Sequence, residues 1–244
     1  MRDKRVRRIV IILIWLAIWQ AMSLLIHNAI LFAGPAETAR TLYSLMITGD
    51  FWISLANTTA RIVLGFTGGS VLGLILAYVA YKNRLFGEFI NPLVTVIKSI
   101  PVASFVILLL IWFGAPFLSL IISALVTFPM VYLNTFEGLC STDVKLLEMA
   151  KVFRMTGSSV IKNIYLPHLK PFLSGAFKLA CGMSWKSGIA AEVIARPLHS
   201  MGDSIYQSKI YIDTAELFAL TLMAVLLAFL FEKLISLLIR RIFR

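Results

Sequence analysis

Long apolar blocks separated by short polar stretches are the feature that most restricts how this chain can fold. The blocks run from about 9 to 26, 55 to 81, 89 to 112, 117 to 139, 171 to 195 and 215 to 239. A helix needs roughly 20 mostly apolar residues to cross the core of a bilayer. Only 14% of the residues are charged, compared with about a quarter in soluble domains. The sequence therefore predicts an all-α membrane protein with about six transmembrane helices, embedded in a lipid bilayer.

The first block has two interpretations. It follows a basic head, and small residues occur near Ala33 and Ala36, as they would in a cleaved signal peptide. The apolar core is longer than the usual core of a signal peptide, however, and it contains Trp15 and Trp19. We therefore expect a retained transmembrane helix.

The positive charges are distributed unevenly among the loops, and this distribution predicts the orientation. Lys and Arg are concentrated before the first block, after the last block, beside Lys82 and Arg84, and between residues 140 and 170. Loops with an excess of Lys and Arg stay in the cytoplasm. We therefore expect a multi-pass protein of the cell (plasma or inner) membrane with both termini in the cytoplasm. The net charge of +11 does not indicate nucleic-acid binding, because the basic residues flank apolar helices instead of alternating with stacking aromatics.

The sequence lacks the patterns that carry catalysis or hold a cofactor. Cys140 and Cys181 fit no metal-ligand spacing, and no glycine-rich segment ends in the Gly-Lys-Ser/Thr of a nucleotide-binding loop. Ser184 and Lys186 are two residues apart, so on a helix they point in different directions. We expect no metal, no cofactor and no intramembrane enzyme, which would need a catalytic constellation at membrane depth.

Three glycines are spaced four residues apart in the second block: Gly65, Gly69 and Gly73. This spacing places them on one face of a helix, where the missing side chains let the backbone of a second helix come close. We interpret them as a helix-packing face, since the alternative, a phosphate-binding loop, lacks its lysine.

The polar stretch between the fourth and fifth blocks contains two short amphipathic segments. Thr142 can cap the first helix. The apolar residues that we expect on one face of this helix are Leu146, Leu147, Ala150 and Phe153. Gly157 starts the second helix, and we expect Pro167 to end it, because the residue before a proline avoids the α region. Together the two segments, within residues 142–168, would form a rigid projection, which we call the knuckle and which suits a groove on a soluble partner. The alternative is an interfacial helix that lies on lipid.

This stretch resembles a known family pattern. Glu148-Met149-Ala150, then Arg154, then Ile164-Tyr165-Leu166-Pro167 is similar to the EAA loop of binding-protein-dependent ABC importer permeases. The family pattern reads Glu-Ala-Ala, three residues, Gly, nine residues, Ile-x-Leu-Pro. Arg154 stands where the family usually has glycine, and Met149 replaces an alanine. We therefore expect the bend between the two short helices to shift to Gly157.

Four further pieces resemble the nitrate/sulfonate/taurine group of these permeases, over roughly residues 35–232. They are Thr58-Thr59-Ala60-Arg61 leading to Gly65-Phe66, Ile100-Pro101 through Trp112-Phe113-Gly114, Phe128-Pro129, and Ala191-Glu192. Each piece is weak alone, but their order and spacing together are specific.

The resemblance implies a type I ABC importer permease fold that works as a two-fold dimer, with a homodimer expected. It also implies two cytoplasmic ATPase subunits, an extracytoplasmic solute-binding protein and a coupling helix near residues 158–165. Residues 1–34 would form a basic segment with the first helix, and residues 35–244 the permease core, with an EAA-like loop at 142–168. The residues expected to dock the ATPase are Glu148, Ala150, Arg154, Gly157, Ser158, Ile161, Ile164, Leu166 and Pro167.

The predicted function is therefore the transmembrane permease subunit of an ATP-driven importer, with hydrolysis in a separate subunit. By the resemblance, the solute is an anion such as nitrate, a sulfonate or taurine, or a small heterocyclic nutrient. The alternative is an ion-coupled secondary transporter, which would show similar internal halves and paired broken helices. The sequence shows no convincing repeat, and that alternative leaves the basic knuckle unexplained.

Three charged residues lie deep in apolar blocks: Arg61, Lys186 and Glu192. A basic residue at the centre of a bilayer costs about 2.5–3.5 kcal/mol on insertion scales, so these side chains should face protein or water. Either Arg61 pairs with Glu192 and stabilises the gate region, or Arg61 and Lys186 line the translocation path and attract an anion. The sequence leaves both alternatives open.

Overall fold

The computed structural model describes residues 2–26, 28 and 30–242, and within this part the chain is helical between short connections. The helices are α1 (Arg2–Ile26), α2 (Pro35–Met46), α3 (Gly49–Lys82), α4 (Arg84–Ser99), α5 (Val102–Phe113), α6 (Ala115–Cys140), α7 (Val144–Val152), α8 (Gly157–Val160), a π-helical turn (Ile161–Tyr165), α9 (Leu166–Ala195), α10 (Met201–Ile210) and α11 (Thr214–Ile242). Positions 1, 27, 29, 243 and 244 of the two expected segments, 1–34 and 35–244, lie outside the described residues.

The expected all-α membrane fold is confirmed, with four to five candidate spans in the described residues where the sequence predicts about six. Within the described residues, four helices are each long and apolar enough to cross a bilayer: α1, α3, α6 and α11. The pair α4 and α5 forms a fifth candidate, bent by 104°. The fifth apolar block corresponds to α9, which has 30 residues but is less apolar because it carries lysines and Glu192.

The bend between α4 and α5 divides the third apolar block, which the sequence presents as one span. Ile100 has an extended backbone, with φ −71° and ψ 128°, and Pro101 follows it. The ring of a proline disfavours the α region for the preceding residue, so the helix stops there and restarts at Val102 in a new direction.

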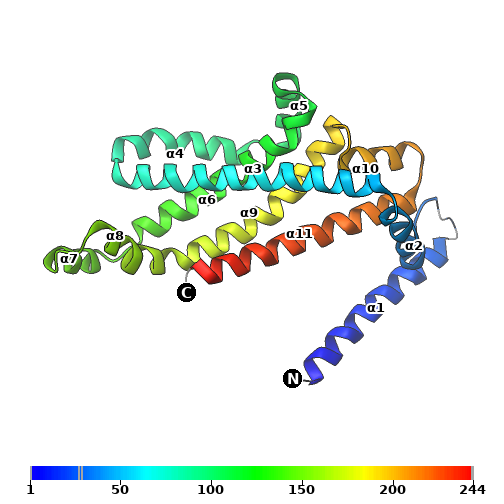
Figure 1. Ribbon diagram of the computed structural model, residues 1–244, viewed down its shortest axis with the longest axis horizontal. Coiled ribbons are helices and arrows are strands. Elements are labelled where there is room, and N and C mark those ends of the chain that lie inside the picture. Colours follow the sequence, from blue (N-terminus) through cyan, green and yellow to red (C-terminus); the bar gives the residue numbers. More distant parts are fainter. Residues whose placement is uncertain (1, 27, 29, 243–244) are drawn as a thin grey trace.

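Helices α3, α6 and α9 form the centre of the molecule, and α11 packs beside them. Helix α3 packs along α6, α6 packs along α9, and α11 covers the other side of α9 (Figure 1). One buried cluster joins these four helices through Phe66, Val131, Trp185 and Phe231. The short helices α7 and α8 lie at one end of this bundle and α10 lies at the opposite end, whereas α1 leaves the body and has none of its apolar window buried (Figure 1).

The glycine face of α3 lies against the backbone of α6. A Cβ at Gly65 would lie 2.2 Å from the carbonyl oxygen of Leu120, and one at Gly69 would lie 2.5 Å from that of Ala124. A Cβ at Gly73 would lie 3.0 Å from the carbonyl oxygen of Phe128. Since backbone atoms cannot rotate away, only residues without side chains let these two helices come so close.

This contact predicts the effect of one added methyl group. Gly69→Ala should lower the free energy of unfolding by about 1–3 kcal/mol, the usual cost of overpacking a close contact. Gly68→Ala is the matched control, because its Cβ meets no atom within 4 Å. Thermal unfolding of both variants in detergent measures the difference, and equal losses of stability would contradict the close contact.

Candidate functional site

The knuckle, residues 142–168, starts with a cap that differs from the one expected. The carboxylate of Asp143 accepts from the backbone N–H of Lys145 at 2.9 Å and caps α7. The hydroxyl of Thr142 instead donates to the carbonyl of Gly138, because Thr142 follows directly on the last turn of α6. The prediction that Thr142 caps α7 was therefore wrong by one residue. Thr156 caps α8 by accepting from the N–H of Ser159.

The bend after α7 lies at Arg154 and not at Gly157. Arg154 has φ +50°, in the left-handed region. Its N–H donates to the carbonyl of Lys151 at 3.0 Å, and the N–H of Met155 donates to that of Ala150 at 2.9 Å. This pair of hydrogen bonds is a Schellman motif, which satisfies the last carbonyls of the helix. The expected shift to Gly157 was wrong, because these bonds stabilise a left-handed residue at position 154 even though it is not glycine.

Pro167 does not end the second short helix. Tyr165 and Leu166 both keep α-helical backbone angles, and the N–H of Leu166 donates back five residues to the carbonyl of Ile161. Pro167 then lies in the first turn of α9, where a missing N–H is tolerated. The π-helical turn thus absorbs the proline, and α8 continues into α9 without a break. Displacement of the knuckle would therefore act directly on α9.

The two faces of α7 have different surroundings. Leu147 and Val160 pack against the buried cluster of Leu139, Tyr165, Leu169 and Leu173. Other apolar side chains of this segment are exposed: Val144 exposes 64% of its surface, Val152 79% and Phe153 73%. Of the four apolar residues expected on one face, Ala150 is buried and Leu147 half-buried, whereas Leu146 and Phe153 are exposed.

The expected docking residues therefore fall into two groups. Ala150 and Ile164 are buried, at 4% and 6% exposure, and Leu166 is half-buried, so these three support the knuckle from inside. The remaining six are exposed: Glu148, Arg154, Gly157, Ser158, Ile161 and Pro167. The sequence reasoning did not include Val152 and Phe153 among the docking residues, because apolar side chains in an amphipathic segment are expected to be buried.

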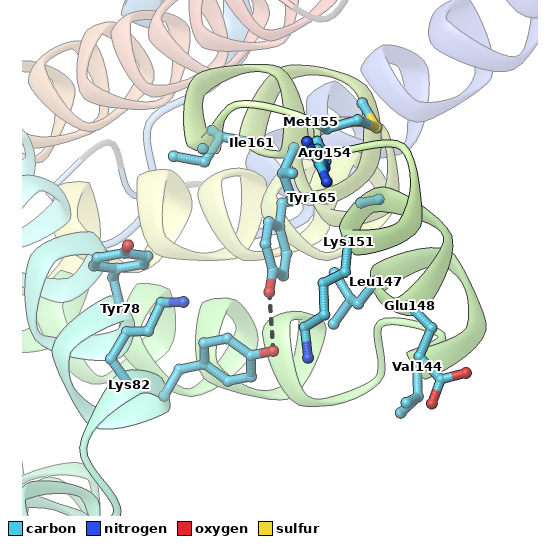
Figure 2. Close-up of a pocket in the computed structure, with 14 residues that line it drawn as sticks. Tyr78, Lys82, Val144, Leu147, Glu148, Lys151, Arg154, Met155, Ile161 and Tyr165 are labelled. Carbon is cyan, nitrogen blue, oxygen red and sulfur yellow. Dashed lines mark hydrogen bonds between the residues drawn. The ribbon is translucent and has the colours of Figure 1, made fainter.

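A pair of tyrosines connects the knuckle to the end of α3. The hydroxyls of Tyr81 and Tyr165 lie 3.1 Å apart, and a dashed line marks this hydrogen bond of Tyr165 in Figure 2. Burial raises the pKa of Tyr165 to about 12, so this phenol keeps its proton in more alkaline solution than an exposed tyrosine does. A hollow of about 710 Å³ lies beside this pair, between α3 and the knuckle.

At the opposite end of the bundle, the carboxylate of Glu192 is fully buried, with 0% exposure. Its Oε1 accepts from Nη1 of Arg61 at 3.3 Å and from Oγ of Ser119 at 3.0 Å. Its Oε2 accepts from Oγ1 of Thr58 at 2.6 Å and from the N–H of Gly202 at 3.4 Å. Buried charges persist where such partners replace water. One carboxylate on α9 thus joins α3, α6 and α10.

Helix α10 is attached to this cluster by its backbone. The N–H of Met201 donates to Oγ1 of Thr58 at 2.9 Å, in addition to the bond from Gly202 to Glu192. A Cβ at Gly202 would lie 2.2 Å from Cβ of Glu192, so a side chain there would push α10 away.

Lys186 does not join the other two charged residues. It is exposed and lines a groove of about 500 Å³ between α9 and α11, together with Trp185 and Glu232. The structure thus brings Arg61 to Glu192 and leaves Lys186 elsewhere. The partners Thr58, Ser119 and Gly202 were missed as members of the cluster, because small polar residues and glycines occur throughout these helices.

Comparison with known proteins identifies sequence relatives. The model of a family described as "Binding-protein-dependent transport system inner membrane component" matches residues 69–244. The putative aliphatic sulfonates transport permease protein SsuC of Bacillus subtilis is 26% identical over 94% of this chain and 83% of that protein. The riboflavin transport system permease protein RibX of Chloroflexus aurantiacus is 25% identical over 93% of this chain and 87% of that protein.

A solved structure shares the fold. The MetNI methionine ABC transporter, in inward-facing conformations, contains a chain that matches with a TM-score of 0.61 and 18% sequence identity. The match covers 82% of this chain and 97% of the other. At this identity the likeness concerns the fold alone.

The geometry at Glu192 predicts that exchanging the two charges will fail. A guanidinium at position 192 has no acceptor for the donors on Thr58, Ser119 and Gly202. Arg61→Glu combined with Glu192→Arg should therefore be no more stable than Glu192→Arg alone, in thermal unfolding in detergent. Recovery of wild-type stability by the double variant would show that the ion pair alone matters.

Glu192→Ala should lower the free energy of unfolding by about 3–5 kcal/mol, the range for breaking a buried pair.

The left-handed Arg154 predicts a stabilising substitution. Arg154→Gly should slow amide hydrogen exchange in α7, because glycine avoids the roughly 1–2 kcal/mol that a side chain costs in this conformation. Lys151→Gly is the matched control inside the helix and should speed exchange, since glycine is about 1 kcal/mol less favourable than alanine there. Faster exchange in Arg154→Gly would contradict the assigned conformation.

Proposed function

This chain belongs to the family of binding-protein-dependent transport system inner membrane components, and on that premise we propose that separate ATPase subunits grip its knuckle from the cytoplasm. The chain is the membrane-spanning permease subunit of an ATP-driven ABC importer of the nitrate/sulfonate/taurine group. Its role is a transport role; hydrolysis of ATP belongs to partner subunits. The secondary-transporter alternative is not favoured.

The exposed apolar face of the knuckle supports this docking proposal. Val144, Val152 and Phe153 expose most of their surface, whereas Ala150 is buried and Leu147 is half-buried against the body. A short helix that presents apolar anchors to water suits insertion into a groove on a soluble partner. We place the contact on these three residues together with the exposed Glu148 and Ile161. The buried Ala150 and Ile164 hold the helix in place for that contact.

The route from the ATPase to the membrane follows from the continuous helix. A partner that moves the knuckle displaces α8, and α8 continues through the π-helical turn into α9. The far end of α9 carries Glu192, which binds α3, α6 and α10. We therefore propose that nucleotide-driven motion of the knuckle reaches the opposite face of the membrane through α9, and that Arg61 and Glu192 stabilise the gate there.

The assembly and orientation are part of the same proposal. We propose a homodimer, because the apolar surface of α1 is unburied in the isolated chain and needs lipid or a second copy to cover it. Both termini and the knuckle would face the cytoplasm, in keeping with their basic residues. An extracytoplasmic solute-binding protein would deliver the solute near α10. Residues 1–34 would form the peripheral first helix, and residues 35–244 the permease core.

The solute proposed is a small anion or a small heterocyclic nutrient. Two relatives are named for transport of aliphatic sulfonates and riboflavin, and a third, CmpB of Synechococcus elongatus, for bicarbonate at 26% identity over 66% of this chain and 58% of that protein. Lys186, exposed beside the groove between α9 and α11, is the residue we propose to attract an anion along the path.

The docking proposal predicts that one charge on the knuckle removes the ATPase. Phe153→Asp should abolish co-purification of the ATPase subunit, because it places a carboxylate in the apolar contact. Leu85→Asp is the matched control, since Leu85 is 78% exposed at the start of α4 but lies outside the knuckle. Retention of the ATPase by Phe153→Asp, or its equal loss from both variants, would refute the proposed contact.

Transport by reconstituted protein tests the function itself. Liposomes that contain the permease, its ATPase and the binding protein should accumulate solute when ATP is supplied. Liposomes with the permease alone should accumulate none, even under an ion gradient. Uptake by the permease alone would favour the secondary-transporter alternative.

A further inference from the structure

The hollow between α3 and the knuckle has features that ATPase docking does not use. It measures about 710 Å³ and is bounded by Tyr78, Tyr81 and Lys82 on α3 and by Leu147, Lys151 and Arg154 on the knuckle. Its walls include Leu147 of α7, whereas Val152 and Phe153 are not among the lining residues. The hollow therefore shares part of its rim (Val144, Glu148 and Ile161) with the proposed docking surface, whereas its three cations do not belong to that surface.

The lining of the hollow carries an excess of positive charge. Lys82, Lys151 and Arg154 line it, with Glu148 as the single carboxylate among the lining residues. In the described part of the chain the ion pairs involve other residues, so these cations have no carboxylate within 4.0 Å. Figure 2 shows Lys82 and Lys151 on opposite walls. Two walls that each offer a cation can hold one anion between them.

Two of the three cations have contacts that restrict their positions. The Nζ atom of Lys82 lies 5.9 Å from the ring centre of Tyr78 and 5.8 Å from that of Tyr81, within the range of cation–π attraction. The backbone of Arg154 is fixed by the Schellman motif. The hydroxyl contact between Tyr81 and Tyr165 keeps the two walls together.

An apolar stripe on α3 leads directly into the hollow. Ile75, Tyr78, Val79 and Lys82 are spaced at i, i+3, i+4 and i+7, so they lie on one helix face. The first three expose 54%, 45% and 37% of their surface. They belong to a helix that is apolar enough to span the bilayer. A ligand with an anionic head and an apolar tail would match both parts, whereas a small soluble anion would make no use of the stripe.

We propose that this hollow binds the phosphate head group of an anionic phospholipid, whose acyl chains lie along the α3 stripe. Basic pockets beside transmembrane helices at the cytoplasmic surface bind such head groups, and tyrosines are enriched at this depth. The phosphate lies between Lys82 on α3 and Lys151 with Arg154 on the knuckle. The bound lipid therefore holds the knuckle against the end of α3.

The test measures lipid retained by the purified permease–ATPase complex. The complex is equilibrated with an equal mixture of phosphatidylglycerol and phosphatidylcholine and examined by native mass spectrometry. The double variant Lys82→Gln/Lys151→Gln removes one cation from each wall. It should bind phosphatidylglycerol about 25-fold more weakly, the equivalent of about 1 kcal/mol for each charge near an anionic lipid.

The matched control is Lys145→Gln/Lys162→Gln, which removes the same charge from exposed positions of the knuckle that do not line the hollow. This control should retain phosphatidylglycerol as the unchanged protein does. Equal weakening of both double variants would overturn the proposal, because it would show a general effect of net charge. Equal retention of the two lipids by the unchanged protein would also overturn it.

A competition experiment separates a lipid from a soluble anion. Inorganic phosphate and glycerol 3-phosphate, added at millimolar concentration, should leave phosphatidylglycerol bound, because neither contacts the apolar stripe. Displacement by either compound would assign the hollow to a soluble phosphate and overturn the lipid. Co-purification of the ATPase is scored in the same samples, so that a failure of docking is distinguished from a failure of lipid binding.

Discussion

The backbones of α3 and α6 touch because Gly65, Gly69 and Gly73 carry no side chains, and both ends of the molecule are arranged by this contact. At one end it brings Arg61 on α3 beside Ser119 on α6, within reach of one carboxylate. At the other end it sets the last turn of α3 against the knuckle. A wider separation of the two helices would take partners away from both places.

Helix α9 relates these two ends to each other. It begins at the knuckle, where a π-helical turn lets the chain pass Pro167 without breaking, and it carries Glu192 near its end. Because Glu192 is fully buried and accepts from three other helices, α9 cannot shift there without leaving donors unsatisfied. A displacement of the knuckle must therefore either be opposed by these hydrogen bonds or move α9 together with the helices bound to Glu192. This behaviour suits the proposed coupling to an external ATPase.

Some parts of the site could be predicted from the sequence for clear physical reasons. Arg61 and Glu192 were noticed because charges are expensive inside apolar blocks and need partners. The roles of Thr58 and Ser119 were not predicted, because hydroxyl side chains are common in such helices and cost little free energy there compared with a charge. They lie 134 and 73 residues from Glu192, so their role depends on how distant helices pack. The lining of the hollow was not predictable for the same reason.

The sequence by itself determined the apolar blocks, the glycine spacing on α3 and the amphipathic character of the knuckle, because each is a local pattern with a fixed period. Only the tertiary structure decided which face of α7 is covered: Leu147 packs toward Tyr165 and Leu169, which leaves Phe153 in the open. The left-handed backbone of Arg154 is a local feature, stabilised by hydrogen bonds at the end of its own helix, but no residue type in the sequence marks it. The burial of Leu147 depends on contacts that exist only once the helices are assembled, and a local pattern does not contain them.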